Sequence, residues 1–166
     1  MVEKRQEDVK TEEIVTLSDG TKVRCVAVSP LLIQAVMDKY KEPEPPVKTV
    51  KTKPGLEETY IDYNDAGYLR EREKVERQRN AASTDAILLM GLPDVKPPKD
   101  DSWVKNLEAL GLEIPKDGPR RRLAYIKYVL LRHSTDLGKV VGVLSRLSGA
   151  TEEQIREAVE GFRRQG

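Results

Sequence analysis

The sequence predicts an α+β fold that is predominantly α-helical, with a small N-terminal β-hairpin, a long central helix and a C-terminal helical unit. Three observations support this prediction. An Asp-Gly dipeptide separates two β-prone runs near the N-terminus, residues 68–90 contain neither proline nor glycine, and apolar residues after residue 102 recur at helical spacing. We expect three successive segments, which cover residues 1–63, 64–91 and 92–166.

The composition narrows the class of function. The 166 residues include 29 Lys and Arg against 28 Asp and Glu, so a strongly basic coat for nucleic acid is excluded. One cysteine and one histidine exclude an intramolecular disulfide and any zinc site that needs paired ligands of these types. The N-terminus is charged and no apolar run approaches the roughly 20 residues of a membrane span. We therefore expect an intracellular protein without membrane contact.

The N-terminal hairpin is predicted from two runs, 13–17 and 21–28, which are joined by Ser18-Asp19-Gly20. Asp-Gly between β-prone runs is typical of a tight hairpin turn, where glycine accepts a positive φ at low cost. Alternation places Cys25 among the small residues of one strand face, which favours a packing role over a nucleophile. Ser29-Pro30 then begins a helix, because serine caps and proline fits the first helical position.

A proline-rich stretch follows this helix. Pro43, Pro45 and Pro46 fall within four positions, which favours extended polyproline II backbone. Residues 43–56 are therefore predicted to form an extended arm or a long loop. Residues 59–63 are predicted to form a short strand that pairs with the N-terminal hairpin.

The long helix is predicted to be capped by Asn64 or Asp65 and to run through residues 68–90. Its stretch from 70 to 80 holds a single apolar residue, whereas the residues from Ala81 onward are much more apolar. We expect its C-terminal end to be anchored and its middle to be exposed. Gly91 is predicted to cap the helix.

The C-terminal segment carries several short helical patterns. Asp100 or Asp101 is expected to cap a helix whose Trp103 serves as a core anchor. Further helices are predicted to begin at Gly118-Pro119, at Ser134 and at Thr151, the last with a capping box. Their apolar stripes and short connections favour one compact helical unit.

Catalytic and cofactor patterns are missing from the sequence. There is no glycine-rich phosphate loop. His133 is not accompanied by a catalytic partner motif, so we interpret it as a residue at a helix boundary. The adjacent carboxylates of Asp100 and Asp101 are most simply explained as caps. We expect no enzymatic activity, no cofactor and no structural metal.

A run of three arginines, 120–122, is the sharpest local anomaly. Residues 119–166 contain ten Lys or Arg against five Asp or Glu, and the run falls in the first turn of a helix, where cations oppose the helix dipole. A phosphate or an acidic partner would offset this cost, although a solvated helix start that tolerates it is the simpler interpretation. The patch is small and has no interleaved aromatic platform, and both features argue against nucleic acid as a partner.

A protein partner is expected elsewhere, along the long helix from Tyr68 to Arg79 and along the arm from Pro43 to Val47. The helix has few apolar side chains there, and an arm that is already extended loses little entropy on docking. The competing interpretation packs the tyrosines on the hairpin and leaves the helix facing water. The residues predicted to contact a partner are Pro43, Pro45, Pro46, Tyr60, Tyr63, Tyr68, Arg72 and Arg79, with Arg120, Arg121 and Arg122 as the next candidates.

The order of these segments resembles a known family. The hairpin sequence VTLSDGTKVRCVAVSP is followed directly by the helix sequence LLIQAVMDKY. After them come, in order, EPEPPV, TYIDYNDAGYLRERE, LLMGLPD, a Trp-bearing helix, YIKYVLL and LSGATEEQIREAVEGF. Over roughly residues 14–164 the chain resembles the tail assembly chaperones and related small tail proteins of long-tailed bacteriophages. The resemblance implies a non-enzymatic chaperone that binds the helical tape measure protein in the host cytoplasm and is absent from the finished tail. It carries over no catalytic residues.

Two features depart from a simple all-helical chaperone, namely the N-terminal hairpin and the two proline-rich connections. They leave open the alternative that the chain is a permanent virion component, such as an accessory tail or connector protein. A nucleic-acid-binding phage regulator is a weaker alternative. Self-association is also open.

Overall fold

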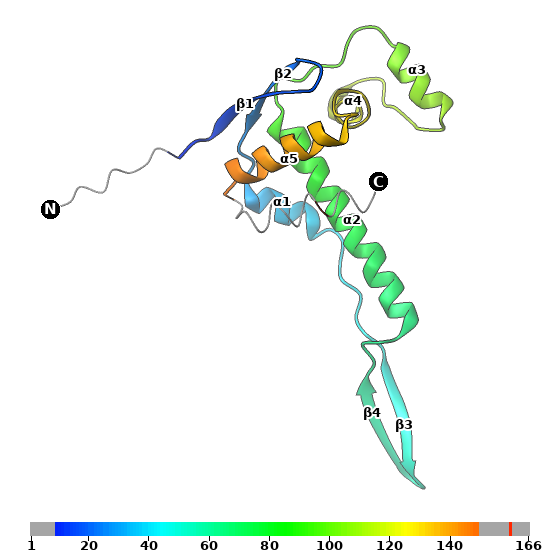
Figure 1. The fold of residues 1–166 in the computed structure, drawn as a ribbon. Helices are drawn as coiled ribbons and strands as arrows, with labels where there is room; N and C mark the ends of the chain where they lie inside the picture. Colours follow the sequence, from blue (N-terminus) through cyan, green and yellow to red (C-terminus); the bar gives the residue numbers. More distant parts are fainter. Residues whose placement is uncertain (1–8, 150–159, 161–166) are drawn as a thin grey trace, which may run out of the picture. The chain divides into compact units, whose positions relative to one another are not determined.

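The computed structural model describes residues 9–149 and residue 160. Its described part contains more helix than strand and includes two antiparallel hairpins, which confirms the predicted α+β class (Figure 1). The helix predicted to begin at Thr151 lies outside the described residues. The elements are β1 (Glu12–Thr16), β2 (Lys22–Val26), α1 (Pro30–Met37), β3 (Val47–Lys53), β4 (Leu56–Ile61), α2 (Ala66–Gly91), α3 (Ser102–Ala109), α4 (Gly118–Tyr125), the π-helical turn η1 (Ile126–Leu130) and α5 (Ser134–Leu147).

The described residues fall into two compact units. Unit 1 combines the chain up to Ile33 with the chain from Thr84 onward, and unit 2 comprises residues 34–83. This division differs from the expected segments 1–63, 64–91 and 92–166. The reason is that the β1–β2 hairpin shares a core with the C-terminal helices, while α1 and α2 each pass from one unit into the other.

The β1–β2 hairpin forms as predicted. Val15 lies opposite Val23, and the turn places Gly20 at a φ of 87°. The Asp19 carboxylate accepts a hydrogen bond from the Thr21 amide at 2.9 Å, which closes the turn locally. The side chains of Val15, Val23 and Cys25 are buried, so the cysteine packs in the core as expected.

The main core of unit 1 lies between this hairpin, the C-terminal end of α2 and α5. Leu88, Ile126, Val140 and Leu144 are almost completely buried in it. Gly91 does not cap α2 in a left-handed conformation, so that prediction was wrong. It lies inside the helix, where an added Cβ would stand 2.5 Å from a methyl carbon of Leu144, and glycine is needed there for close packing.

A second, smaller cluster of unit 1 surrounds Trp103. The indole is 8% exposed and meets the ring of Tyr125 edge to face at 5.4 Å, while Ala124 completes the contact. This confirms Trp103 as a core anchor. Asp100, rather than the residue next to the helix, accepts hydrogen bonds from the amide and hydroxyl of Ser102 at the start of α3.

Unit 2 corrects the prediction for residues 43–56. Instead of a continuous arm or loop, Val47–Lys53 forms strand β3, which pairs with β4 in an antiparallel hairpin. The strand predicted near residues 59–63 exists, but its partner is β3 and not the N-terminal hairpin. Pro54-Gly55 provides the turn, with Gly55 at a φ of 87°. We call this hairpin the ribbon.

Candidate functional site

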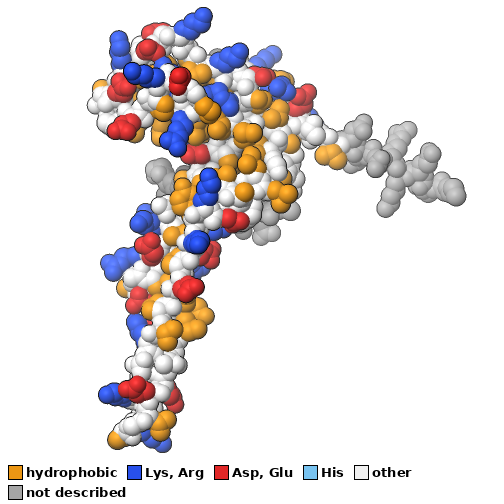
Figure 2. All heavy atoms as spheres, turned by 180° about the vertical axis from the view of Figure 1, so that it is seen from behind, with side chains coloured by type: hydrophobic (Ala, Val, Ile, Leu, Met, Phe, Trp, Pro, Cys, Tyr) orange, Lys and Arg blue, Asp and Glu red, His pale blue; other side chains and the backbone are white. Residues whose placement is uncertain are grey.

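The ribbon exposes apolar side chains on both faces. Val47 and Ile61, which lie opposite each other, are 67% and 51% exposed. Val50, Leu56 and Tyr60 are exposed as well. A two-stranded hairpin without a packed face is marginally stable in water. No residue of β3 or β4 is buried, so the apolar side chains of the ribbon lie at its surface (Figure 2).

A charged clasp fixes the base of the ribbon to the start of α2. The Lys48 ammonium lies 2.5 Å from a carboxylate oxygen of Asp62 and 3.1 Å from one of Asp65. Asp65 also accepts the amide of Tyr68 at 2.8 Å, which confirms it as the helix cap. These bonds lower the pKa of Asp62, chiefly through Lys48, and the pKa of Asp65, chiefly through the Tyr68 amide. The same carboxylates raise the pKa of Lys48.

The predicted proline and tyrosine contacts fall around this clasp. Pro43, Pro45 and Pro46 are half-buried just before β3, and the Pro46 carbonyl accepts the amide of Asp62 at 2.9 Å. Tyr60 and Tyr63 are exposed and Tyr68 is half-buried. The exposure of the first two is contrary to the competing interpretation, in which the tyrosines pack on the N-terminal hairpin.

The charged half of α2 carries two further residues that were predicted to contact a partner, Arg72 and Arg79. Their surroundings in the structure differ. Arg79 is an internal link, because its guanidinium donates to the carbonyl of Tyr40 at 3.0 Å and lies 3.8 Å from Asp38. Arg72 is exposed and lines a shallow hollow of about 300 Å³. Met37 and the buried Val75 contribute apolar surface to this hollow, and Glu76 lines it as well.

The arginine run does not form a single exposed patch. The guanidinium of Arg121 contacts Asp101 at 2.5 Å and stacks 5.1 Å from the centre of the Trp103 ring. Arg122 donates to the carbonyls of Leu89 and Leu92, each at 2.7 Å, at the C-terminal end of α2. These internal partners offset the unfavourable position of the cations at a helix start, while Arg120 stays exposed.

The two remaining reactive side chains, Cys25 and His133, lie in different surroundings. Burial raises the pKa of the Cys25 thiol to about 11, which keeps it protonated at neutral pH. His133 is exposed at the start of α5, where its carbonyl accepts the amide of Leu137 at 3.0 Å. Among the described residues, no three His, Cys, Asp or Glu side chains gather as ligands for a metal ion.

The ribbon and its clasp were missed by reasoning from sequence. The signal was present, because two alternating runs flank Pro54-Gly55, a dipeptide typical of a turn. The three prolines just before it favoured a continuous extended arm instead. The pairing of Lys48 with Asp62 follows only from the register of the ribbon.

Comparison of the chain with protein families, curated proteins and solved structures gives no match. No helix in the described part of the chain has both the length and the apolar character needed to cross a bilayer.

Proposed function

We propose that the chain is a non-enzymatic assembly chaperone of a long-tailed bacteriophage, which binds the tape measure protein in the host cytoplasm. The observation that carries the proposal is the surface of unit 2, where the ribbon and the charged half of α2 are ordered outside any core. The ordered resemblance of the sequence to tail assembly chaperones supplies the identity of the partner.

The hollow beside Arg72 is suited to a helical partner. Its floor holds Met37 and Val75, and its rim carries side chains of both charges, Arg72 and Glu76. An amphipathic helix inserts apolar side chains into such a groove and meets charges at the rim. Tyr60 and Tyr63 lie exposed in the same unit and provide aromatic anchors, which interfaces favour.

The experiment is co-expression of the chain with the tape measure protein of the same phage. We expect the chain to raise the soluble fraction of that protein and to co-purify with it. The variant Arg72→Glu changes the rim of the hollow without removing a hydrogen bond or an ion pair of the described structure, and it is expected to reduce co-purification. Arg79 is unsuitable for this purpose, because its substitution breaks the link to Tyr40.

Lys74→Glu is the matched control. Lys74 is exposed on the same helix, and its substitution by glutamate makes the same change of charge. Lys74 does not line the hollow. Equal co-purification of both variants and the unaltered chain would refute the assignment of the site. Failure of the unaltered chain to bind or solubilise the tape measure protein would refute the function.

A permanent virion component is the second candidate function. The open-edged ribbon favours it, because unpaired strand edges in a lasting structural protein are commonly covered by a neighbour. Mass spectrometry of purified virions separates the two. Absence from virions together with abundance in the lysate supports the chaperone, and presence at tens of copies supports the structural component.

A further inference from the structure

We propose that two copies of this chain associate head to tail through the ribbon, so that β4 of one copy pairs antiparallel with β3 of the next. The inference goes beyond the proposed function, because it concerns self-association and does not depend on the partner of unit 2. It rests on three properties of the ribbon, namely its open edges, its register and the opposite charges of its two strands.

Both outer edges of the ribbon offer backbone groups for pairing. The sheet has two strands only, so neither β3 nor β4 has a second neighbour among the described residues. The amide of Asp62 donates to the carbonyl of Pro46, which identifies these opposed residues as a hydrogen-bonded pair. Because such pairs alternate along an antiparallel ladder, Thr59 and Thr49 direct their N–H and C=O groups outward.

The register within the ribbon also suits pairing between copies. Thr49 lies opposite Thr59, Val47 opposite Ile61 and Lys51 opposite Glu57, all on one face. If a second ribbon is placed beside the first in the same orientation, its β3 runs antiparallel to β4 of the first. The outward-pointing residues then meet the same partners that they have within one copy, so Thr59 of the first copy meets Thr49 of the second.

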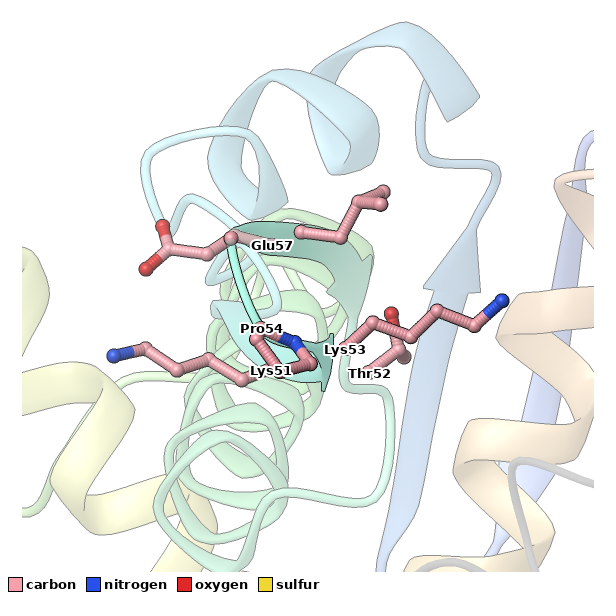
Figure 3. Close-up of a pocket in the computed structure, with 7 residues that line it drawn as sticks. Lys51, Thr52, Lys53, Pro54 and Glu57 are labelled. Carbon is pink, nitrogen blue, oxygen red and sulfur yellow. The ribbon is translucent and has the colours of Figure 1, made fainter.

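The charges of the two strands favour this arrangement over a two-fold one. Strand β3 carries Lys48, Lys51 and Lys53, whereas β4 carries Glu57 and Glu58. Figure 3 shows Lys51 and Glu57 extending on one side of the ribbon and Lys53 on the other. Head-to-tail pairing sets Glu57 of one copy opposite Lys51 of the next. Two-fold pairing of β3 with β3 brings together Lys51 and Lys53 of both copies, and neither strand carries a carboxylate; Lys48 is already paired with Asp62 and Asp65.

Exposed apolar side chains would be covered by the same contact. Val47 and Ile61 become neighbours across the new pair, and each is at least half-exposed in the single chain. The surface area that one strand edge can bury is small compared with the ~1,200 Å² that a stable interface buries. The association is therefore expected to be weak and to depend strongly on protein concentration. Because head-to-tail contacts leave one free edge at each end, they continue until a ring closes or a filament grows.

The test uses two full-length variants that each block one edge. Thr59→Pro removes the outward N–H of β4, and Thr49→Pro removes that of β3, while every inward hydrogen bond of the ribbon is kept. Sedimentation velocity of the unaltered chain at about 0.1 mM is expected to show assemblies larger than a monomer. Each proline variant alone is expected to weaken association at least about tenfold. Mixed together they are expected to form a 1:1 dimer, because each supplies the edge that the other lacks.

Thr59→Val and Thr49→Val are the matched controls, since they keep the N–H and the strand preference of the residue. Both are expected to associate like the unaltered chain. Hydrogen exchange at the inward amide of Tyr60 verifies that the ribbon is still formed in the proline variants. A monomeric unaltered chain at about 0.1 mM would overturn the proposal. So would a proline variant that dimerises alone, which indicates two-fold pairing, or a mixture that stays monomeric.

Discussion

The two units of this chain reach order by different means. Unit 1 buries a continuous apolar cluster between β1, β2, the end of α2 and α5, in which Val140, Leu144 and Ile126 have no exposed surface. In unit 2, whose residues are all described, Val75 alone is buried. What holds unit 2 together is polar: the clasp of Lys48 with two aspartates and the link from Arg79 to Tyr40.

This difference bears on function. Apolar burial contributes roughly 25 cal/mol per Å², so a unit that buries one side chain gains little from folding by itself. Its ribbon nevertheless keeps apolar side chains ordered and exposed. A contact with another molecule is the direct way for such a surface to gain stability, which is why both proposals concern unit 2.

The largest effect on stability is expected from a substitution that creates a cavity in the core of unit 1. Leu144→Ala removes a completely buried side chain that packs against Gly91, and it should lower the free energy of unfolding by about 2–5 kcal/mol. Urea unfolding followed by circular dichroism measures this change. Leu56→Ala in the ribbon is the matched control, because its side chain is 54% exposed and its loss should change the free energy by less than about 0.5 kcal/mol. Equal effects of the two substitutions would refute the contrast between the units.

A smaller but still global effect is expected from the one buried charged residue of the described core. Asp136, which is 7% exposed, accepts the amide of Ser18 at 3.0 Å and its hydroxyl at 2.7 Å. Asp136→Ala leaves both donors without their partner and should cost about 1–3 kcal/mol of unfolding free energy.

Comparison with Ser18→Ala tests the mechanism of this loss. That variant removes only the hydroxyl donor and keeps the amide bond to Asp136. It should therefore unfold with a free energy between those of Asp136→Ala and the unaltered chain. A larger loss from Ser18→Ala than from Asp136→Ala would contradict this account.

Sequence reasoning succeeded where a local pattern decides the structure. Asp19-Gly20 predicted the first hairpin, and the absence of proline and glycine predicted α2. The cap of α2 was predicted to be Asn64 or Asp65, and it is Asp65. It also identified Trp103 as a core residue. In each case the deciding interactions involve residues near one another in the chain or a strong apolar preference.

It failed where distant residues decide. The role of Gly91 depends on Leu144, and the partners of Arg122 are carbonyls at the end of α2. Neither relation is encoded within a short window. The same is true of the candidate site, because Arg72 and Arg79 look alike in sequence and only their surroundings separate a rim residue from an internal link.

A local effect of pH is expected in unit 2. The pKa values of Asp62 and Asp65 lie below those of an unfolded chain, about 3.9, so their contribution to stability is complete above that pH and is lost as the pH falls through the lowered values. Hydrogen exchange at the Tyr68 amide, which Asp65 accepts, should accelerate below about pH 4 beyond the intrinsic pH dependence. Lys48→Met should shift this acceleration to higher pH, because the lysine, after the Tyr68 amide itself, is the next largest cause of the lowered pKa of Asp65. An unchanged profile would show that the clasp does not hold the base of the ribbon.

The smallest effect is expected on the surface of α2. Glu73 and Arg77 form an ion pair at 2.5 Å, but both side chains are more than 60% exposed. A solvated pair at this spacing contributes about 0.2–0.5 kcal/mol, so Glu73→Ala should leave the urea transition almost unchanged. If the charged half of α2 is held by the clasp at its start and by Arg79 near its middle, then Arg79→Met should accelerate amide exchange around Val75 more than Glu73→Ala does. The reverse order would mean that surface pairs, rather than the two internal links, keep this half of the helix in place. The expected order would show that the exposed charges of α2 are not what holds this half of the helix.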